Sequence, residues 1–267
     1  MSFVQTDEIK IYYREYGAGE PLLFIAGAGM DSRGWKFQAD EFSKTYRVIV
    51  FDNRGSGRSD APKHPYSIAM LAQDTKNLMD ALDIGSAHLV GLSMGGMIAQ
   101  EFAITFPDRV RSLVIAASTS NGQSIQRNFI EAVNRWVKND VNMETRIEEL
   151  LPLQFTKKLL SNHETYKAFK ELMLNDKFPQ SLYALSQQVD AALNFDSLGR
   201  LEKIKAPTLV VVGDEDINTP IALSEQLNKQ IPNSQLCIIG GSHGFNIENA
   251  AMFNNAIIEF LNNLERP

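Results

Sequence analysis

Short apolar runs recur along the chain and alternate with segments of helical periodicity. The runs are rich in β-branched side chains and apolar on both faces, which is typical of parallel strands covered by helices on either side. They occupy residues 21–25, 46–51, 87–90, 110–115, 208–212 and 235–239. Helical patterns lie between and after them, over residues 68–82, 97–106 and about 249–264. This alternation predicts an α/β fold with a doubly wound, mostly parallel sheet.

The first segment of the chain has a different pattern, in which apolar and polar positions alternate. Its order is Ile9, Lys10, Ile11, Tyr12, Tyr13 and Arg14. A period of two predicts a hairpin strand with one buried face, and it places Lys10, Tyr12 and Arg14 on the exposed face.

The alternation of strands and helices stops between residues 122 and 198. Three amphipathic helical stripes replace it, made of Ile125, Phe129, Val133, Trp136 and Val137, of Tyr166, Phe169 and Met173, and of Leu182, Leu185, Val189 and Leu193. Helices inserted between two halves of a parallel sheet predict a cap over one edge of that sheet. We therefore expect an α/β core of residues 1–121 and 199–267, with a helical cap of residues 122–198.

Composition and charge narrow the classes of function. Of the 267 residues 44% are hydrophobic and 22% charged, which is ordinary for a globular protein with one substantial core. A formal net charge of -6 argues against nucleic acid or an anionic membrane as partner. The first residues do not resemble a signal peptide, and no apolar run approaches the roughly 18 residues of a membrane helix. These features predict a soluble cytoplasmic protein and leave its oligomeric state open.

Cysteine and histidine usage bears on redox and metal chemistry. The single cysteine, Cys237, excludes an intrachain disulfide, and its place in the last apolar run predicts an inert core residue. No group of His, Cys and carboxylate residues has the spacing of metal ligands. We therefore expect an enzyme without metal or cofactor.

The strongest chemical signal is the segment Leu89–Met97, in which an apolar run leads through Gly91-Leu92-Ser93-Met94-Gly95 into a helical pattern. A serine nucleophile above a sheet needs a tight strand-to-helix turn, and small residues two positions to either side prevent collisions there. The helix that follows points its amide groups and the positive end of its dipole at the reaction centre. Ser93 is therefore the candidate nucleophile.

A serine hydroxyl needs a base, and the base needs a group that orients it. Of the four histidines, His243 lies in Gly240-Gly241-Ser242-His243-Gly244, between the last apolar run and the last helix. That position brings it to the carboxyl edge of the sheet, where Ser93 also emerges. His88 lies within a strand, and His64 and His163 are expected to be solvated.

Three acids compete for the orienting role, because Asp214, Glu215 and Asp216 all follow the strand over residues 208–212. Each of them also has an ordinary interpretation as a carboxylate that stabilises a turn or a helix start. The pattern of residues alone does not choose among them.

From end to end the chain resembles the α/β-hydrolase superfamily, in which the triad order is the one of Ser93, Asp216 and His243. The superfamily pattern Gly-x-x-Asp-x-x-x-Pro matches Gly213, Asp216 and Pro220, and this resemblance implies that Asp216 is the acid. Some relatives carry the acid after the strand before the cap, but residues 118–121 include no carboxylate.

The resemblance also implies an oxyanion hole made of backbone amides. The turn supplies the N–H of Met94, and the family's His-Gly-x-Gly loop corresponds to residues 26–29, which gives the N–H of Ala28. Ala26 stands where the family usually has histidine, so the hydrogen bonds that normally support this loop are in question. The segment 52–59 matches the superfamily signature Asp-x-Arg-Gly-x-Gly-x-Ser and is expected to be a rigid supporting turn rather than a phosphate loop.

These residues predict acyl transfer through an acyl-enzyme, with a small ester or lactone as substrate. The elbow is most similar to those of small esterases and lactonases, including 3-oxoadipate enol-lactonases, and the closing Gly-Gly-Ser-His-Gly-Phe is similar to that of aminoacrylate hydrolases. Carbon–carbon bond hydrolysis and cofactor-free perhydrolysis are alternatives on the same triad. A non-enzymatic ligand receptor or signalling partner is the alternative of another class. Trp136 of the cap is a candidate for the substrate pocket, and a structural role for it is equally open.

Overall fold

The computed structural model describes residues 2–6, 8–125 and 127–264, and its centre is an eight-stranded sheet. The strands are β1 (Ser2–Gln5), β2 (Lys10–Tyr16), β3 (Pro21–Ile25), β4 (Arg47–Phe51), β5 (Ala87–Leu92), β6 (Val110–Ala116), β7 (Thr208–Gly213) and β8 (Ser234–Ile239). Their order is β1-β2-β4-β3-β5-β6-β7-β8, and only the pairs β1–β2 and β2–β4 are antiparallel. The predicted doubly wound, mostly parallel sheet is confirmed.

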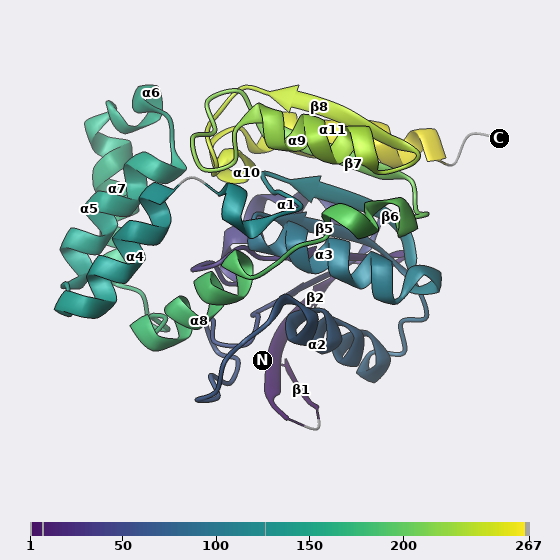
Figure 1. The fold of residues 1–267 in the computed structure, drawn as a ribbon, viewed down its shortest axis with the longest axis horizontal. Helices are drawn as coiled ribbons and strands as arrows, with labels where there is room; N and C mark the ends of the chain where they lie inside the picture. The colour runs from purple at the N-terminus through teal and green to yellow at the C-terminus, as the bar shows by residue number, and fades with distance from the viewer. Residues whose placement is uncertain (1, 7, 126, 265–267) are drawn as a thin grey trace.

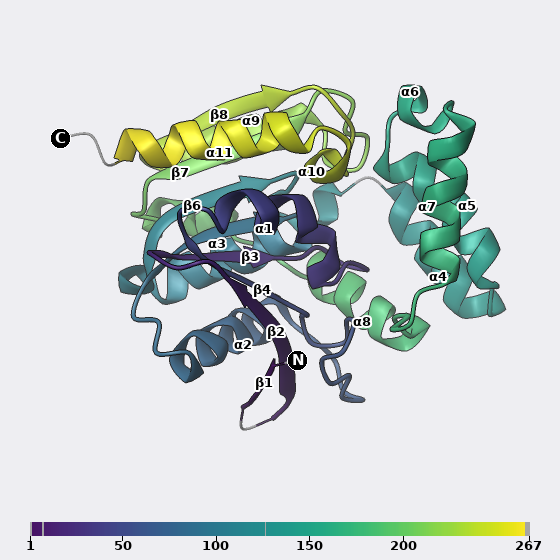
Figure 2. The same ribbon diagram turned by 180° about the vertical axis from the view of Figure 1, so that it is seen from behind.

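Helices cover both faces of the sheet, as Figures 1 and 2 show from opposite sides. On one face lie α2 (Ile68–Ala81), α3 (Met94–Thr105) and α9 (Ile221–Gln230), and on the other lie α1 (Lys36–Phe42) and α11 (Ala250–Leu264). Short helices complete the core: η1 (Ser32–Trp35), η2 (Pro107–Arg109), η3 (Gly122–Ser124), η4 (Leu198–Lys203) and α10 (Phe245–Glu248). Each face buries its own apolar cluster, because the strands are apolar on both sides.

Five helices are inserted between β6 and β7, and they lie beyond the carboxyl ends of the parallel strands (Figure 1, left). They are α4 (Arg127–Asn139), α5 (Met143–Gln154), α6 (Lys157–Leu160), α7 (His163–Leu174) and α8 (Leu182–Leu193), and we call them the cap. The cap has two small apolar clusters, one between α4 and α8 and one around α5. Whether residues 122–198 form a separate domain stays a prediction.

Three positions differ from the sequence pattern. Val137 is 44% exposed, because α4 buries the neighbouring face that carries Ala132, Val133 and Trp136. Tyr12 is buried rather than exposed, since its ring lies 4.2 Å from the Arg58 guanidinium, and Arg58 belongs to a turn that covers this side of β2. Cys237 is only half-buried, because β8 is the last strand of the sheet. Burial nevertheless raises the pKa of the Cys237 thiol, which keeps it protonated.

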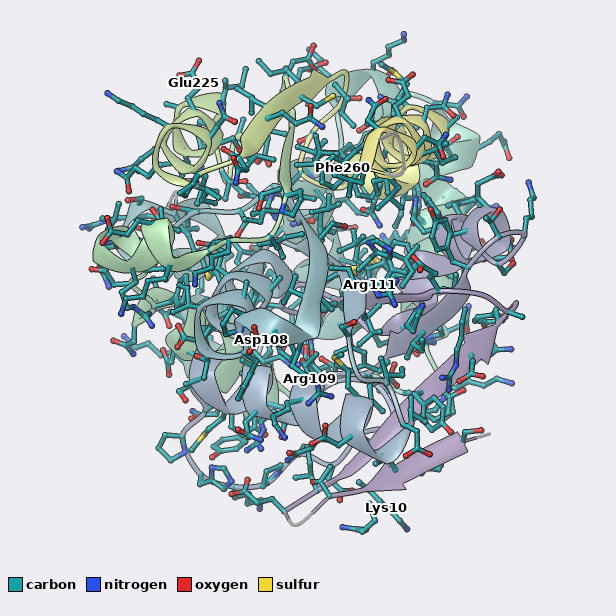
Figure 3. The ribbon with its side chains drawn as sticks, turned by 90° about the vertical axis from the view of Figure 1, so that its right-hand side faces the viewer. Lys10, Asp108, Arg109, Arg111, Glu225 and Phe260 are labelled. Carbon is teal, nitrogen blue, oxygen red and sulfur yellow. The ribbon has the colours of Figure 1, made fainter. Side chains whose placement is uncertain are left out.

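Figure 3 views the molecule from the side opposite the cap, where β6 begins close to Arg109 and Arg111. Here the Arg111 guanidinium pairs with Glu20, and His88 bonds through Nδ1 to Ser112 Oγ at 2.8 Å and through Nε2 to Glu20 at 3.2 Å. His88 thus has the structural role that was expected of it. None of the helices within the described part of the chain combines the length and apolar character needed to span a membrane.

Candidate active site

Ser93 lies between β5 and α3 in a backbone conformation that serine rarely adopts, with φ 57° and ψ −119°. The turn is tight: a Cβ at Gly91 would lie 2.2 Å from the carbonyl oxygen of Gly95, and one at Gly95 would lie 2.0 Å from that of Ile25. Both glycines are therefore required by contact with the backbone. Such a conformation costs about 1–3 kcal/mol and persists only where neighbouring bonds hold it.

Two of those bonds come from β6 and the residues that follow it. The Ser93 N–H donates to the carbonyl of Ala116 at 2.8 Å, and Ser118 Oγ donates to the carbonyl of Ser93 at 2.8 Å. Ser118 begins the stretch in which some relatives carry the acid. In this chain it stabilises the turn under the candidate nucleophile instead.

His243 lies between β8 and α10, and its Nδ1 is 2.8 Å from Asp216 Oδ2 in the loop after β7. Both side chains are buried. Asp216 Oδ1 also accepts the N–H groups of Asn218 and Thr219 at 2.8 and 2.9 Å, and Oδ2 accepts Thr219 Oγ1 at 2.8 Å. Burial raises the pKa of Asp216, but the charge of His243 and these hydrogen bonds outweigh it and hold the pKa below its ordinary value. Asp216 is thus an ionised acceptor for His243.

The two neighbouring acids do not contact His243. Asp214 accepts the Gly241 N–H at 2.9 Å and so joins the loops after β7 and β8, and Glu215 is exposed. Of the other histidines, His163 is exposed at the start of α7, and His64 Nδ1 is 3.0 Å from the carbonyl of Pro65 in a surface loop. The geometry therefore pairs Asp216 with His243, as the sequence comparison implied.

The loop after β3 reaches the same place. A Cβ at Gly27 would lie 3.7 Å from Ser93 Oγ, so the loop passes directly beside the candidate nucleophile. Among the described residues, neither the Ala28 N–H nor the Met94 N–H donates a hydrogen bond to a protein acceptor. Two unpaired amides next to a serine hydroxyl are the arrangement that an oxyanion needs.

The segment 52–59 supports this loop from below. Asp52 is fully buried; its Oδ1 accepts the Ser32 N–H and its Oδ2 the Arg58 N–H, both at 2.8 Å. Asn53 Nδ2 donates to the carbonyl of Ala26 at 2.9 Å. These contacts confirm the prediction of a supporting turn, and they supply part of the bonding that the missing histidine put in question.

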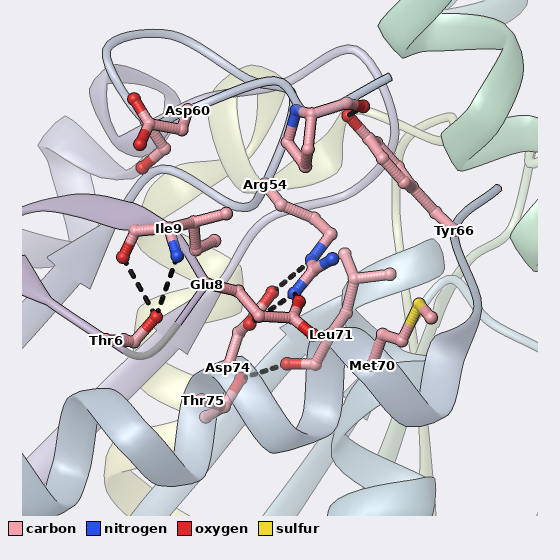
Figure 4. Close-up of polar contacts among 12 residues, drawn as sticks. Thr6, Glu8, Ile9, Arg54, Asp60, Tyr66, Met70, Leu71, Asp74 and Thr75 are labelled. Carbon is pink, nitrogen blue, oxygen red and sulfur yellow. Dashed lines mark hydrogen bonds and ion pairs between the residues drawn. The ribbon is translucent and has the colours of Figure 1, made fainter. Parts of the chain in front are cut away.

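The same turn also carries a buried ion pair, drawn in Figure 4. Arg54 Nε and one terminal nitrogen donate to the two carboxylate oxygens of Asp74 on α2 at 2.6 and 2.8 Å. Glu8, at the surface, accepts a third bond at 3.0 Å. The pair ties the turn to α2 and fixes its position relative to the sheet.

Ser93 and His243 line one pocket of about 80 Å³ between the sheet edge and the cap. Its walls are mainly apolar, with Met30, Leu92 and Met97 from the core and Ile125, Phe129, Ile130, Val189 and Leu193 from the cap side. Within the described residues, His243 is the only lining side chain that can carry a charge near neutral pH. No hydrogen bond joins Ser93 Oγ to His243 Nε2 in that part of the chain, and such bonds are commonly long until substrate binds.

Trp136 does not line this pocket, so the prediction of a substrate contact there is wrong. It is buried between α4 and α8 beside Val133 and Val189, and its Nε1 donates to Glu149 at 2.5 Å. Phe129 and Ile130 line the pocket in its place, about two turns earlier on α4. Gln154 and Asn218 are lining residues that the sequence pattern gave no reason to select. Among the described residues no group of three or more His, Cys, Asp and Glu side chains is arranged to hold a metal ion.

Known proteins share both the sequence pattern and the fold. Residues 20–250 match the family described as alpha/beta hydrolase fold. The RutD protein of Azorhizobium caulinodans, named a carbamate hydrolase, is 27% identical over 267 residues, the whole of both chains. A 2-hydroxy-6-oxononadienedioate/2-hydroxy-6-oxononatrienedioate hydrolase of Burkholderia vietnamiensis is 32% identical over 95% of this chain and 91% of its own. The crystal structure of the enol-lactonase from Burkholderia xenovorans LB400 superimposes with a TM-score of 0.88 at 25% identity, over 98% of this chain and all of that one.

Proposed function

The chain belongs to the α/β-hydrolase fold family, and from this premise we propose that it is a serine hydrolase that cleaves a small carboxylic ester or lactone. One arrangement carries the proposal: Ser93 on its strained turn and the buried Asp216–His243 pair open onto the same pocket. The amides of Ala28 and Met94 belong to residues that line it too.

In the first half-reaction, Ser93 Oγ attacks the carbonyl carbon of the substrate and His243 takes the hydroxyl proton on Nε2. Asp216 holds His243 through Nδ1, which leaves Nε2 free for this role, and its negative charge stabilises the imidazolium. The oxygen of the tetrahedral intermediate accepts the Ala28 and Met94 N–H groups. When the intermediate collapses, His243 returns the proton to the departing alcohol oxygen and an ester on Ser93 remains.

In the second half-reaction, water attacks this ester and His243 again takes the proton. The second tetrahedral intermediate uses the same two amides, and its collapse releases the carboxylic acid and returns the proton to Ser93. With a lactone, the alcohol stays attached to the acyl group until this step.

The pocket favours a small, uncharged substrate. Its volume of about 80 Å³ corresponds to roughly five to eight water molecules, on the scale by which one water needs about 10–15 Å³. No basic side chain lines it among the described residues, so a substrate carboxylate would have no charge partner there. The relation to an enol-lactonase supports a lactone as one member of this class.

Carbon–carbon bond hydrolysis is the second candidate, because the relative in Burkholderia vietnamiensis is named as the hydrolase of a dienedioate. Such a substrate brings two carboxylates, which the apolar pocket is poorly suited to receive. Cofactor-free perhydrolysis would use the same triad with hydrogen peroxide in place of water.

The test is a panel of substrates with the wild type and with Ser93→Ala. It includes p-nitrophenyl acetate, butyrate and octanoate, small lactones, a phenyl carbamate and a 2-hydroxy-6-oxodienoate. We expect turnover of acetate, butyrate or lactones by the wild type and none by Ser93→Ala. Faster turnover of the dienoate than of every ester and lactone would contradict the proposed bond type. Binding of these compounds without any turnover would favour the receptor alternative.

A further inference from the structure

Gln188, in the middle of α8 in the cap, is fully buried and makes hydrogen bonds to two loops of the core. Its Oε1 accepts the Gly29 N–H at 3.3 Å and Gln180 Nε2 at 2.9 Å. Its Nε2 donates to the carbonyl of Arg54 at 2.8 Å and to Ser56 Oγ at 2.9 Å. Both oxygen and nitrogen are thus fully used, so the side chain has one fixed orientation.

The contact to Gly29 acts on the loop that carries the Ala28 amide. The carbonyl of Gly27 and the N–H of Ala28 belong to one planar peptide unit and point in opposite directions. That carbonyl accepts the Met30 N–H at 3.3 Å, which turns the Ala28 N–H the other way. The next peptide unit ends at the Gly29 N–H, and Gln188 fixes its direction. Gly29 has φ +77°, so this turn has little conformational preference of its own to hold it.

Two side chains therefore hold the loop from its two ends. Asn53 bonds the carbonyl of Ala26 from the core, and Gln188 bonds the Gly29 N–H from the cap. Ala26 has no polar side-chain atom and contributes no hydrogen bond of its own from that position. The support that the family pattern places at residue 26 is supplied here from two distant segments.

We propose that Gln188 is a positioning residue for the oxyanion hole: it aligns the Ala28 N–H through Gly29 and so makes transition-state stabilisation depend on the docked cap. The inference rests on the proposed function, since an oxyanion arises only in an acyl-transfer reaction. It goes beyond it by assigning a catalytic consequence to a side chain that lies outside the pocket and touches no substrate.

The experiment compares Gln188→Met, which keeps the length of the side chain and removes its donor and acceptor, with Gln188→Glu, which keeps the acceptor for Gly29. Ser112→Ala is the control, because it removes a buried bond to His88 at the opposite edge of the sheet. For each protein we measure the melting temperature, kcat and KM for p-nitrophenyl acetate, and the Ki of a trifluoromethyl ketone. Serine addition to that ketone forms a stable oxyanion, so its Ki reports the hole itself.

We expect Gln188→Met to lower kcat/KM and to raise Ki by the same factor, on the order of the 10²-fold that loss of one oxyanion donor costs. KM should change little, and Gln188→Glu should recover at least about tenfold of the loss, as an acceptor for Gly29 is retained. Ser112→Ala should lower the melting temperature without changing the ratio of Ki to substrate KM.

Three results would overturn the inference: an unchanged Ki in Gln188→Met, equal losses in the Met and Glu variants, or a matching change of Ki in Ser112→Ala. If Gln188→Met does not fold, Gln180→Met replaces it, because it removes the donor that holds Gln188 Oε1 beside Gly29. An unchanged Ki in that variant would count against the inference in the same way. Failure of the wild type to bind the ketone or to turn over any ester would overturn the proposed function and the inference together.

Discussion

At the scale of single residues, the acid of the proposed triad is separated from its neighbours by burial and bonding. Asp216 contacts His243 Nδ1 at 2.8 Å, whereas Asp214 bonds the Gly241 N–H and Glu215 is exposed. We expect Asp216→Asn to lower kcat by about 10⁴-fold, because an amide holds the imidazole in the wrong tautomer. The measurement is kcat for this variant beside Asp214→Asn and Glu215→Gln, with a thermal melt for each. Loss of activity in Asp214→Asn with a mild effect in Asp216→Asn would place the acid two residues earlier.

The lowered pKa of Asp216 has a consequence for stability. A carboxyl group whose pKa is lower in the folded than in the unfolded chain stabilises the fold above its ordinary pKa near 3.8. That contribution is lost as the pH falls through the lower, folded-state pKa. We therefore expect the free energy of unfolding of the wild type to exceed that of Asp216→Asn at pH 6, and the difference to shrink below pH 4. Urea unfolding from pH 6 to pH 3 measures it, and a difference that grows on acidification would contradict the assignment.

At the scale of elements, the helix α4 separates the pocket from the interior of the cap. Phe129 lines the pocket, whereas Trp136 is buried against α8. Phe129→Ala should shift the preference among p-nitrophenyl esters towards longer acyl chains, because it enlarges the apolar wall. Trp136→Ala should instead destabilise the fold by about 3–5 kcal/mol and lower activity on all esters alike. The reverse result, a changed preference only in Trp136→Ala, would show that the pocket is lined differently.

The connection between the turn over residues 52–59 and the helix α2 depends on the Arg54–Asp74 pair of Figure 4. Both side chains are nearly inaccessible, so Asp74→Ala leaves a buried guanidinium without its main partner. We expect this change to cost about 3–5 kcal/mol in the free energy of unfolding. Glu8→Ala is the matched control and should cost less than about 1 kcal/mol, because Glu8 is 62% exposed. Equal costs in urea unfolding would mean that burial of the pair contributes nothing.

At the scale of the whole molecule, the cap bonds each of the loops that form the site. At the end of α5, the carbonyls of Leu153 and Gln154 accept Asn218 Nδ2 and the Gly244 N–H, both at 2.7 Å. These acceptors reach the loops of Asp216 and His243, while Gln188 reaches the loop of Ala28. The cap therefore shapes the reaction centre as well as the pocket.

How far the sequence predicts this molecule depends on the range of the interactions involved. The sheet, Ser93 and His243 follow from local patterns, because a strand, a tight turn and a helix are encoded within a few residues. Asp216 required the family pattern, since three adjacent acids look alike without their partners. Gln188 could not be found from the sequence, because its bond to Gly29 joins residues 159 apart. Trp136 was misplaced because an apolar stripe marks a buried face of a helix without saying what it is buried against.

The most direct test of the proposed mechanism is covalent labelling with a fluorophosphonate, read by intact mass and by peptide mapping. The reagent phosphonylates a serine that is activated by a base and faces an oxyanion hole. We predict one adduct per chain, located on Ser93 and absent from Ser93→Ala, with ester turnover lost in proportion to labelling. Ester turnover that continues after complete labelling, or an adduct on another residue, would contradict the assignment of Ser93 as the nucleophile.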